Sequence, residues 1–381
     1  MFHFGKPQDY LGVDLGAGGV KMVELHGQKG RPVLFTYGLT SDQQNIHSLF
    51  IRNDKTLDEL LQEKKLPEGR EKTSSVAART PEEDETSKYA AILRAVHTQS
   101  KMRATVAVVS LPVSAVFHAL VTLPIVKKQE FEHVLKAEIK KLLPYPLEET
   151  ALDYQIVSTI EGKGQQVLVN AVPRTLVVFY SKVFKQAGLK LDSLEPESMA
   201  LARALVGRDT ATTMVVDMGA ERTNFFIIEK SVPVTHHSIE VGGEKINALL
   251  AKILGLEPQL VEQVKRDLFS QPGENRILTK DRLLSVLSPV IDPIIKEIQY
   301  GFDLYLRQSG NENKIPEKII LSGGAAQCPY LTEFIANKFK MKCYIGDPWG
   351  RVVYQDSLKP VLHAIGPRMS VAIGLALRNM V

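Results

Sequence analysis

Two short stretches of the chain repeat one residue pattern that suits phosphate and metal binding. They are residues 10–25 (YLGVDLGAGGVKMVEL) and residues 214–227 (MVVDMGAERTNFFI). Each contains an apolar, β-prone run, then Asp-x-Gly, then a second such run, which predicts two strands joined by a tight turn. Glycine lets the backbone N–H groups of the turn approach an anion with no side chain in the way. The sequence therefore predicts two hairpins that hold a polyphosphate between them.

One aspartate in each copy is the candidate metal ligand. Asp14 and Asp217 occupy the same place in the two copies, at the end of the first apolar run. A carboxylate there suits a magnesium ion or its waters, although Asp is also a common turn former. Because the whole unit is repeated, which indicates a duplicated architecture, we interpret both as the magnesium environment. The cofactor-binding candidates around them are Gly16, Ala17, Gly18, Gly19 and Lys21 in the first copy, Gly219, Ala220 and Thr223 in the second, and Gly242 and Gly243 after it.

A third glycine motif follows a predicted strand near the C-terminus, in residues 318–330 (KIILSGGAAQCPY). Gly323, Gly324 and Ala325 would let an adenine or ribose pack against bare backbone, and they equally suit an ordinary helix start. Glu297, in the segment EIQYGF, either borders the purine or packs in the core. For Lys21 two interpretations also remain open, a point charge that meets a phosphate or a surface lysine.

In sequence order, DLGAGGVK, DMGAERT, the Glu195-Pro196 dipeptide and LSGGAA resemble the phosphate-1, phosphate-2, connecting and adenosine motifs of actin-like ATPases. The resemblance runs from about residue 8 to the end. It implies an α/β, actin-like fold of two duplicated, ribonuclease H-like domains, with ATP and Mg²⁺ between them. It also implies a catalytic role for Glu195 in orienting the attacking water, the alternative being a charge favoured at a helix N-terminus. Ala17 stands where many members carry a hydroxyl, so we expect at most a slow ATPase.

The middle of the chain narrows the resemblance. The run LPIVKKQEFEHVLKAEIKKLLPYPLEETALDYQIV, with EIQYGFDLYL and AIGLALR further on, is similar to the PilM family of type IV pilus assembly proteins, which is related to FtsA. The resemblance implies an inserted FtsA-type α+β subdomain and a partner, the N-terminal cytoplasmic tail of a PilN-like inner-membrane protein. Other pilus assembly proteins and a second copy of the chain are further possible partners. The partner-binding candidates beside the subdomain are Val113, Val116, Leu123, Pro124, Tyr145 and Pro146.

These motifs divide the 381 residues into two domains and an insert. We expect a first actin-like domain over 1–112 and 192–208, the inserted subdomain over 113–191, and a second actin-like domain over 209–381. The highly charged stretch 52–88 predicts a flexible insertion. Predicted helices cover 90–100, 127–143, 176–186 and 194–205, and predicted strands in the insert cover 116–123, 153–159 and 166–171.

Composition and local pattern exclude several classes of function. A net charge of +4, from 47 basic and 43 acidic residues, is too balanced to predict nucleic-acid binding. Residues 105–126 lack charges over a membrane-spanning length, but Pro112 and Pro124 favour consecutive buried strands, so we expect no direct membrane insertion. The N-terminus lacks a signal-peptide pattern, which predicts a cytoplasmic protein. The resemblance to the PilM family implies that its partner holds it at the inner membrane. A small-molecule kinase of the same fold, or a competence or type II secretion counterpart, is the alternative.

Overall fold

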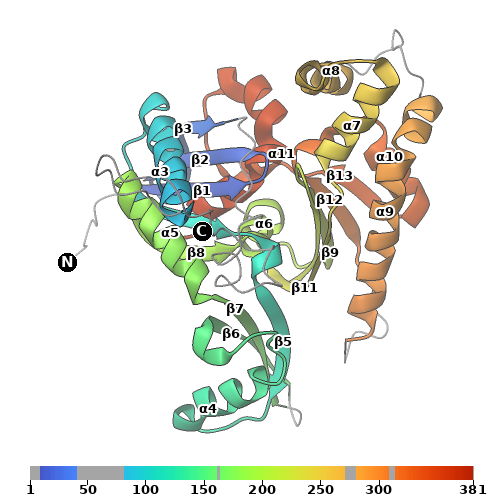
Figure 1. The fold of residues 1–381 in the computed structure, drawn as a ribbon. Helices are drawn as coiled ribbons and strands as arrows, with labels where there is room; N and C mark the ends of the chain where they lie inside the picture. The colour runs from blue at the N-terminus through green and yellow to red at the C-terminus, as the bar shows by residue number, and fades with distance from the viewer. Residues whose placement is uncertain (1–8, 41–80, 161–163, 271–279, 309–313, 381) are drawn as a thin grey trace, which may run out of the picture.

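The computed structural model describes residues 9–40, 81–160, 164–270, 280–308 and 314–380. Two lobes stand side by side in Figure 1, and a smaller subdomain hangs below the first lobe. Each lobe is built on a five-stranded sheet, and the two sheets have the same arrangement of three antiparallel and two parallel strands. This duplication confirms the predicted actin-like α/β class.

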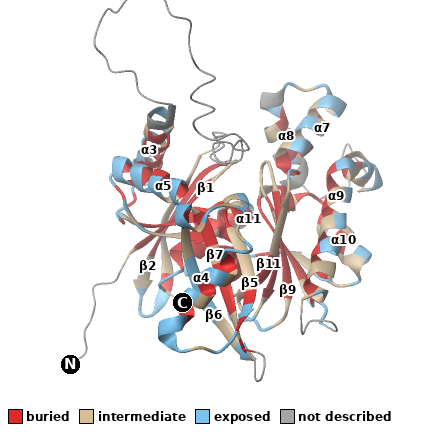
Figure 2. Ribbon diagram, turned by 60° about the horizontal axis from the view of Figure 1, so that its bottom comes forward, coloured by how far each residue is buried: buried red, intermediate tan, exposed pale blue. Residues whose placement is uncertain are grey.

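The first sheet has the order β3-β2-β1-β4-β8 and the second has the order β11-β10-β9-β12-β13. The central strand of each is mostly apolar apart from Asp14 in β1 and Asp217 in β9, as expected for a strand covered on both faces, and Figure 2 shows these strands buried. The strands are β1 (Tyr10–Gly16), β2 (Gly19–Gln28), β3 (Arg31–Leu39), β4 (Val106–Leu111) and β8 (Lys190–Pro196), then β9 (Thr213–Met218), β10 (Thr223–Glu229), β11 (Val232–Ile239), β12 (Lys318–Ser322) and β13 (Lys342–Ile345).

Helices cover both faces of each sheet. On the outer face of the first sheet lie α3 (Pro81–Gln99) and α5 (Arg174–Ala187), which share one core with β1 and β4. The second lobe carries α9 (Lys280–Leu306) and α10 (Leu331–Phe339) on its sheet, with α7 (Gly243–Leu254) and α8 (Pro258–Ser270) at one end. Between the two sheets lie α6 (Glu197–Leu201), which continues as a π-helical turn over Ala202–Val206, and α11 (Lys359–Ala376).

The two helices between the sheets pack with backbone against backbone. A Cβ on Gly12 of β1 would lie 2.0 Å from the carbonyl oxygen of Ala372 in α11. A Cβ on Gly374 of α11 would lie 2.0 Å from the carbonyl oxygen of Ala200 in α6. Only glycine permits these approaches, so α11 is fixed at once to the central strand of the first lobe and to the connecting helix.

The inserted subdomain is a three-stranded antiparallel sheet of order β5-β7-β6, covered on one face by α4 (Lys128–Ile139). Its strands are β5 (Phe117–Leu123), β6 (Thr150–Ile160) and β7 (Gly164–Pro173), and Phe131, Leu135 and Ile139 of α4 supply its core. The next helix, α5, shares its core with α3, β1 and β4, and the expected end of the insert at 191 stays a prediction.

Three further expectations change at element boundaries. The helix expected over 90–100 begins at Pro81, so the end of the predicted flexible stretch is helical, while residues 52–80 lie outside the described residues. The helix expected over 127–143 ends at Ile139. The helix expected from 194 begins at Glu197, because β8 continues through Pro196. Residues 106–111 and 117–123 are strands, and none of the helices in the described ranges is long and apolar enough to cross a membrane.

Candidate functional site

A cavity of about 1360 Å³ lies between the two lobes. Both Asp-x-Gly turns open into it, and α7, α8, α11 and the 3₁₀ turn Gly324–Gln327 form the rest of its wall. Twelve of the predicted cofactor-binding residues line it: Asp14, Gly16, Ala17, Gly18, Lys21, Asp217, Gly219, Ala220, Gly243, Gly323, Gly324 and Ala325.

The two turns face each other across one end of the cavity. A Cβ added to Gly18 would lie 3.2 Å from the Cβ of Ala220 in the opposite turn. Behind the first turn, Gly19 has φ +102° and a Cβ there would lie 2.3 Å from the carbonyl oxygen of Thr40, so both conformation and space require glycine. Two sets of backbone groups are therefore held close enough to contact one small ligand from opposite sides.

Three carboxylates and one ammonium group line this end of the cavity. Lys21 Nζ lies 3.2 Å from Asp14 Oδ2, and the Ser110 hydroxyl donates to Asp14 Oδ1 at 2.9 Å. Burial, and then the charge of Asp14, raise the pKa of Asp217 to about 6. Burial, and then the charges of Asp14 and Asp217, raise the pKa of Glu197 well above its usual value. The site thus carries more negative charge than Lys21 alone neutralises.

This donor set fits a divalent cation. Carboxylate oxygens are the preferred protein ligands of Mg²⁺, and a cation between Asp14 and Asp217 would relieve the repulsion that raises the pKa of Asp217. The glycine turns beside the carboxylates present backbone N–H groups, which suit phosphate oxygens. The groups at this end of the cavity therefore suit a divalent cation together with phosphate oxygens.

Two further glycine-containing segments, around Gly323 and around Gly243, form neighbouring parts of the cavity wall. Gly323 has φ +83°, and a Cβ there would lie 2.2 Å from the carbonyl oxygen of Met218, so β12 and β9 meet without a side chain between them. Its N–H donates to the Pro367 carbonyl of α11 at 2.9 Å. At the start of α7 the Gly243 N–H donates to the Gly219 carbonyl at 2.9 Å, which fixes the helix N-terminus to the second turn. A Cβ on Gly242 would lie 2.4 Å from the Ala220 carbonyl oxygen.

Four predicted residues do not line the cavity. Gly19 and Gly242 support the turns from behind, and the Thr223 hydroxyl donates to the Val241 carbonyl at 2.6 Å. A carboxylate oxygen of Glu297 lies 3.3 Å from Nε2 of His237 in β11, and Glu297 is not among the residues that line the cavity.

The structure places Glu195, the predicted catalytic residue, outside the lining of the cavity. Both of its carboxylate oxygens accept hydrogen bonds from Arg203, at 2.6 and 2.9 Å, and the residue is not among those that line the cavity. β8 extends through Pro196, and Glu197 follows it as the first residue of α6. Of Glu195 and Glu197, only Glu197 lines the cavity. Asn224 Nδ2 donates to Glu197 at 3.3 Å.

Sequence reasoning also missed the α8 side of the cavity. Lys265 is 7% exposed, lines the cavity, and forms an ion pair with Glu262. Asn247 of α7 donates to the same carboxylate at 3.0 Å, and its own buried Oδ1 accepts no hydrogen bond from the described residues. The only signal in the sequence was a lysine on a strongly amphipathic helix, which is typical of any surface helix.

A family model described as type IV pilus assembly protein PilM matches residues 71–380. The chain belongs to the PilM family. Its duplicated lobes and inserted subdomain are the actin-like architecture of that family, and the FtsA relationship predicted from the sequence is also confirmed.

Similar proteins agree with this assignment. The cell division protein FtsA of Pseudomonas aeruginosa is 24% identical over 200 residues, which are 49% of this chain and 48% of FtsA. The chain thus spans about half the length of that curated relative. A structure of the PilM-PilN type IV pilus biogenesis complex superposes with a TM-score of 0.73 at 21% identity, over 98% of both chains. The ethanolamine utilization protein EutJ of Carboxydothermus hydrogenoformans has a TM-score of 0.52 at 15% identity, over 99% of this chain and 92% of EutJ.

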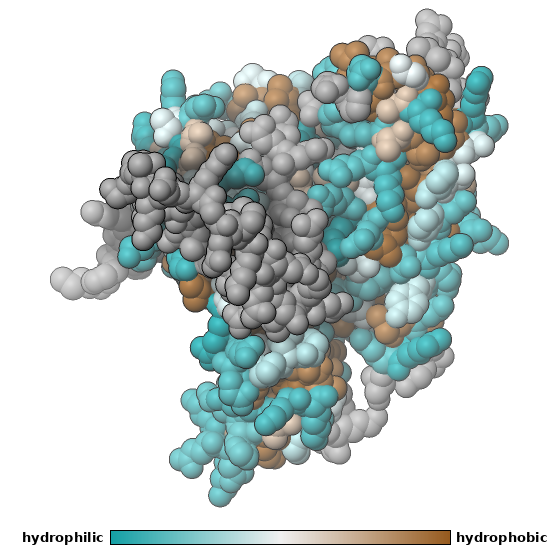
Figure 3. All heavy atoms as spheres, in the orientation of Figure 1, coloured by the Kyte–Doolittle hydropathy of each residue, from teal (hydrophilic) through white to brown (hydrophobic). Residues whose placement is uncertain are grey.

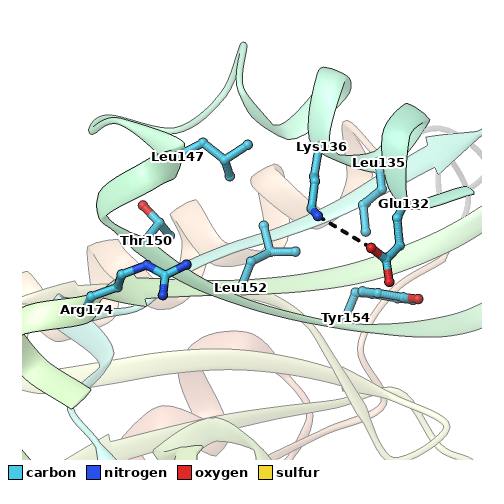
Figure 4. Close-up of a pocket in the computed structure, with 8 residues that line it drawn as sticks. All are labelled: Glu132, Leu135, Lys136, Leu147, Thr150, Leu152, Tyr154 and Arg174. Atoms are coloured by element: carbon cyan, nitrogen blue, oxygen red, sulfur yellow. Dashed lines mark hydrogen bonds and ion pairs between the residues drawn. The ribbon is translucent and has the colours of Figure 1, made fainter. Parts of the chain in front are cut away.

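The predicted partner-binding residues of the PilM-like insert lie in different surroundings. Val113 lines the cavity between the lobes, whereas Val116 and Leu123 are buried in apolar cores. Pro124 and Pro146 are exposed and Tyr145 is half-buried. None of these three residues lines the smaller cavity of the subdomain. That smaller cavity, of about 250 Å³, lies between α4, the start of β6 and the start of α5 (Figure 4).

Proposed function

We propose that this member of the PilM family is a nucleotide-binding assembly protein of a type IV pilus. It binds ATP with Mg²⁺ between its lobes and holds the N-terminal cytoplasmic tail of a PilN-like inner-membrane protein on its inserted subdomain. The observation that carries the first part is the pair of facing glycine turns with Asp14, Asp217 and Lys21 around them. Its place in the cell is then the cytoplasmic face of the inner membrane, where the partner holds it.

In this proposal the phosphates lie between the two turns and the magnesium ion lies at Asp14 and Asp217. Lys21, now paired with Asp14 at 3.2 Å, supplies a positive charge to a phosphate. The adenosine lies toward Gly323 and Gly324, where bare backbone forms the wall. Lys265 and Asn247 supply polar groups from α7 and α8 on that side.

The same geometry supports slow turnover. Ala17 gives the first turn no hydroxyl, and one missing transition-state donor is worth about 10²–10³ in rate. Glu197 is the carboxylate placed to orient a water, because Glu195 is held by Arg203. We therefore propose Glu197, in place of Glu195, as the residue that sets the hydrolysis rate.

Titration calorimetry with ATP, with and without Mg²⁺, tests the nucleotide site. Asp14→Ala removes a metal ligand, and we expect the metal-dependent part of the affinity to disappear. Asp209→Ala is the control, since Asp209 is an exposed aspartate that pairs with Lys318 outside the cavity. Equal, metal-independent affinities of the wild type and Asp14→Ala would contradict the proposal.

Fluorescence anisotropy with a labelled peptide of the PilN-like tail tests the partner. The relative solved as the PilM-PilN complex supports this partner class. We expect a Kd of micromolar order, usual for a short segment that becomes ordered on binding. Tyr145 is half-buried in the surface of the subdomain, and this burial raises the pKa of its hydroxyl. Tyr145→Ala should weaken binding by about 1–2 kcal/mol, as loss of an aromatic anchor does. Tyr300→Ala, at an exposed tyrosine of the second lobe, is the control.

A further inference from the structure

Arg222 lines the cavity between the lobes, and the proposed function gives its side chain no role. It ends the second Asp-x-Gly turn, which is closed by a hydrogen bond from the Gly219 N–H to the Arg222 carbonyl at 2.9 Å. Its side chain is 19% exposed. The guanidinium group is therefore carried by a fixed point of the backbone, at the end of the cavity where the two turns face each other.

The strand that follows shows on which side of the cavity Arg222 lies. Arg222 comes directly before β10 and two positions before Asn224, and alternate residues of a strand share one face. Asn224 and Glu197 also line the cavity, and Asn224 Nδ2 donates to Glu197 at 3.3 Å. Arg222 precedes β10 whereas Gly323 follows β12, and β9 lies between these two strands in the sheet. Arg222 is therefore on the side of Glu197, the residue proposed to orient water toward the terminal phosphate, and not on the side of the proposed adenosine wall.

The guanidinium group is held by a weak ion pair. Nη2 of Arg222 donates to Oε1 of Glu240 at 2.6 Å, while Nε and Nη1 form no hydrogen bond with the part of the chain that the structure describes. The Glu240 side chain is 76% exposed, and an ion pair with so exposed a partner contributes little, because water solvates the carboxylate as well. The planar fork of N–H donors on an arginine matches the oxygens of a phosphate. Exchange of Glu240 for a phosphate therefore costs little and gains stronger hydrogen bonds.

The remaining groups at this end leave a terminal phosphate short of a donor. Ala17 gives the first turn no hydroxyl, and Lys21 Nζ lies 3.2 Å from Asp14 Oδ2. A triphosphate adds a negative group to a site already lined by three carboxylates, so a further side-chain cation favours it over a diphosphate. Figure 3 shows mainly hydrophilic side chains where the second lobe borders the space between the lobes, as a site for so charged a ligand requires.

We propose that Arg222 is the residue by which this site distinguishes a nucleoside triphosphate from a diphosphate. When a triphosphate is bound, the guanidinium group leaves Glu240 and donates to oxygens of the terminal phosphate. With a diphosphate, or with no nucleotide, it stays with Glu240. This assignment rests on the proposed nucleotide site and gives that site a preference between its ligands.

Titration calorimetry of the full-length protein with ATP and with ADP, both with Mg²⁺, tests the assignment. Hydrogen bonds to charged groups predict that the wild type binds ATP about 10- to 100-fold more tightly than ADP. Arg222→Ala should remove this preference, because ATP affinity falls by that factor while ADP affinity stays within about twofold. A residue that merely supported the turn would lower both affinities together.

Three further variants locate the contact. Arg222→Lys keeps the charge without the planar fork and should retain only part of the preference for ATP. Glu240→Gln removes the competing partner, so ATP should bind at least as tightly as to the wild type, with unchanged ADP affinity. Arg307→Ala is the matched control, at an exposed arginine that does not line the cavity. Urea unfolding without nucleotide should give nearly equal midpoints for the wild type and Arg222→Ala, since only an exposed ion pair is lost.

The outcomes separate this inference from the function on which it rests. If ATP does not bind the wild type, the proposed nucleotide site is wrong and the inference falls with it. If the wild type binds ATP and ADP equally well, or Arg222→Ala weakens both alike, Arg222 does not contact a terminal phosphate and the inference is overturned while the nucleotide site stands. An Arg222→Ala protein that keeps the preference of the wild type for ATP overturns it in the same way.

Discussion

Replacement of Asp217 by asparagine should make the protein more stable while it removes the metal-dependent part of nucleotide binding. Burial, and then the charge of Asp14, raise the pKa of Asp217 from 3.8 to about 6. Each pKa unit corresponds to about 1.4 kcal/mol, so at neutral pH the ionised carboxylate costs the folded protein on the order of 3 kcal/mol. Asparagine keeps an oxygen acceptor and removes the charge. Because some of the contacts of Asp217 are lost with the charge, we expect a gain of about 1–3 kcal/mol in the free energy of unfolding.

The pH dependence of this gain follows from the sign of the shift. The folded carboxylate has the higher pKa, so between about pH 4 and pH 6 the folded state binds more protons than the unfolded state. The stability of the wild type therefore falls as the pH rises through this window, relative to the variant. The advantage of Asp217→Asn should be full above about pH 6 and should vanish toward pH 4. The buried histidines His118 and His236, whose pKa values are lowered chiefly by burial, titrate alike in both proteins and cancel in the difference.

Urea unfolding at several pH values measures the effect, with the buried Trp349 as the fluorescent reporter. A second series with saturating ATP and Mg²⁺ should stabilise the wild type and leave the variant nearly unchanged, since only the wild type keeps both carboxylates. A variant that is less stable than the wild type at neutral pH, or an advantage that does not shrink on acidification, would refute the charge-repulsion account of this site.

Four other substitutions, and one control substitution, give expected outcomes of different kinds. Ala17→Ser should leave ATP affinity nearly intact and raise hydrolysis by up to about 100-fold, whereas a wild-type turnover above about 1 s⁻¹ would contradict the slow-ATPase proposal. Glu195→Gln should lower the free energy of unfolding, measured in urea, by about 3 kcal/mol or more through the loss of its ion pair with Arg203, with little change in ATP affinity. Glu197→Gln should lower turnover in a phosphate-release assay. Loss of turnover in Glu195→Gln and not in Glu197→Gln would restore Glu195 to the site. Gly374→Ala should destabilise the protein by about 1–3 kcal/mol or more, because its Cβ would lie 2.0 Å from the Ala200 carbonyl oxygen. Gly350→Ala, where the nearest atom lies at 3.8 Å, should change the unfolding midpoint little.

The parts of the site that depend on local sequence were predictable. An Asp-x-Gly between two apolar runs can form few other structures than a hairpin, and the repeat of that unit indicated the duplicated fold. The glycine at 323 was visible for the same reason, since its turn follows a buried strand. These features are set by residues within a few positions of one another.

The parts that depend on tertiary packing were not predictable in the same way. Glu195 and Glu197 differ by two positions, and which of them faces the cavity depends on where β8 ends, which the pairing with β4 determines. From the sequence alone, the apolar residues Val116 and Leu123 suit the wall of a binding groove as well as a buried core. Only the positions of the surrounding elements decide between the two. Lys265 reaches the cavity only because α8 packs against α7. Sequence periodicity shows that one face of a helix or strand is buried, but it does not show which other element packs against that face.

The glycine contacts of α11 have a consequence for the way in which the lobes can move. Where two backbones touch, no side chain remains that could change rotamer and let one element slide past the other, which is how shear motions proceed. At Gly12 and Gly374 that contact joins α11 to both the first sheet and the connecting helix. Any movement between the lobes must therefore carry β1, α11 and α6 together at these two contacts, because α11 has no room to slide along either neighbour.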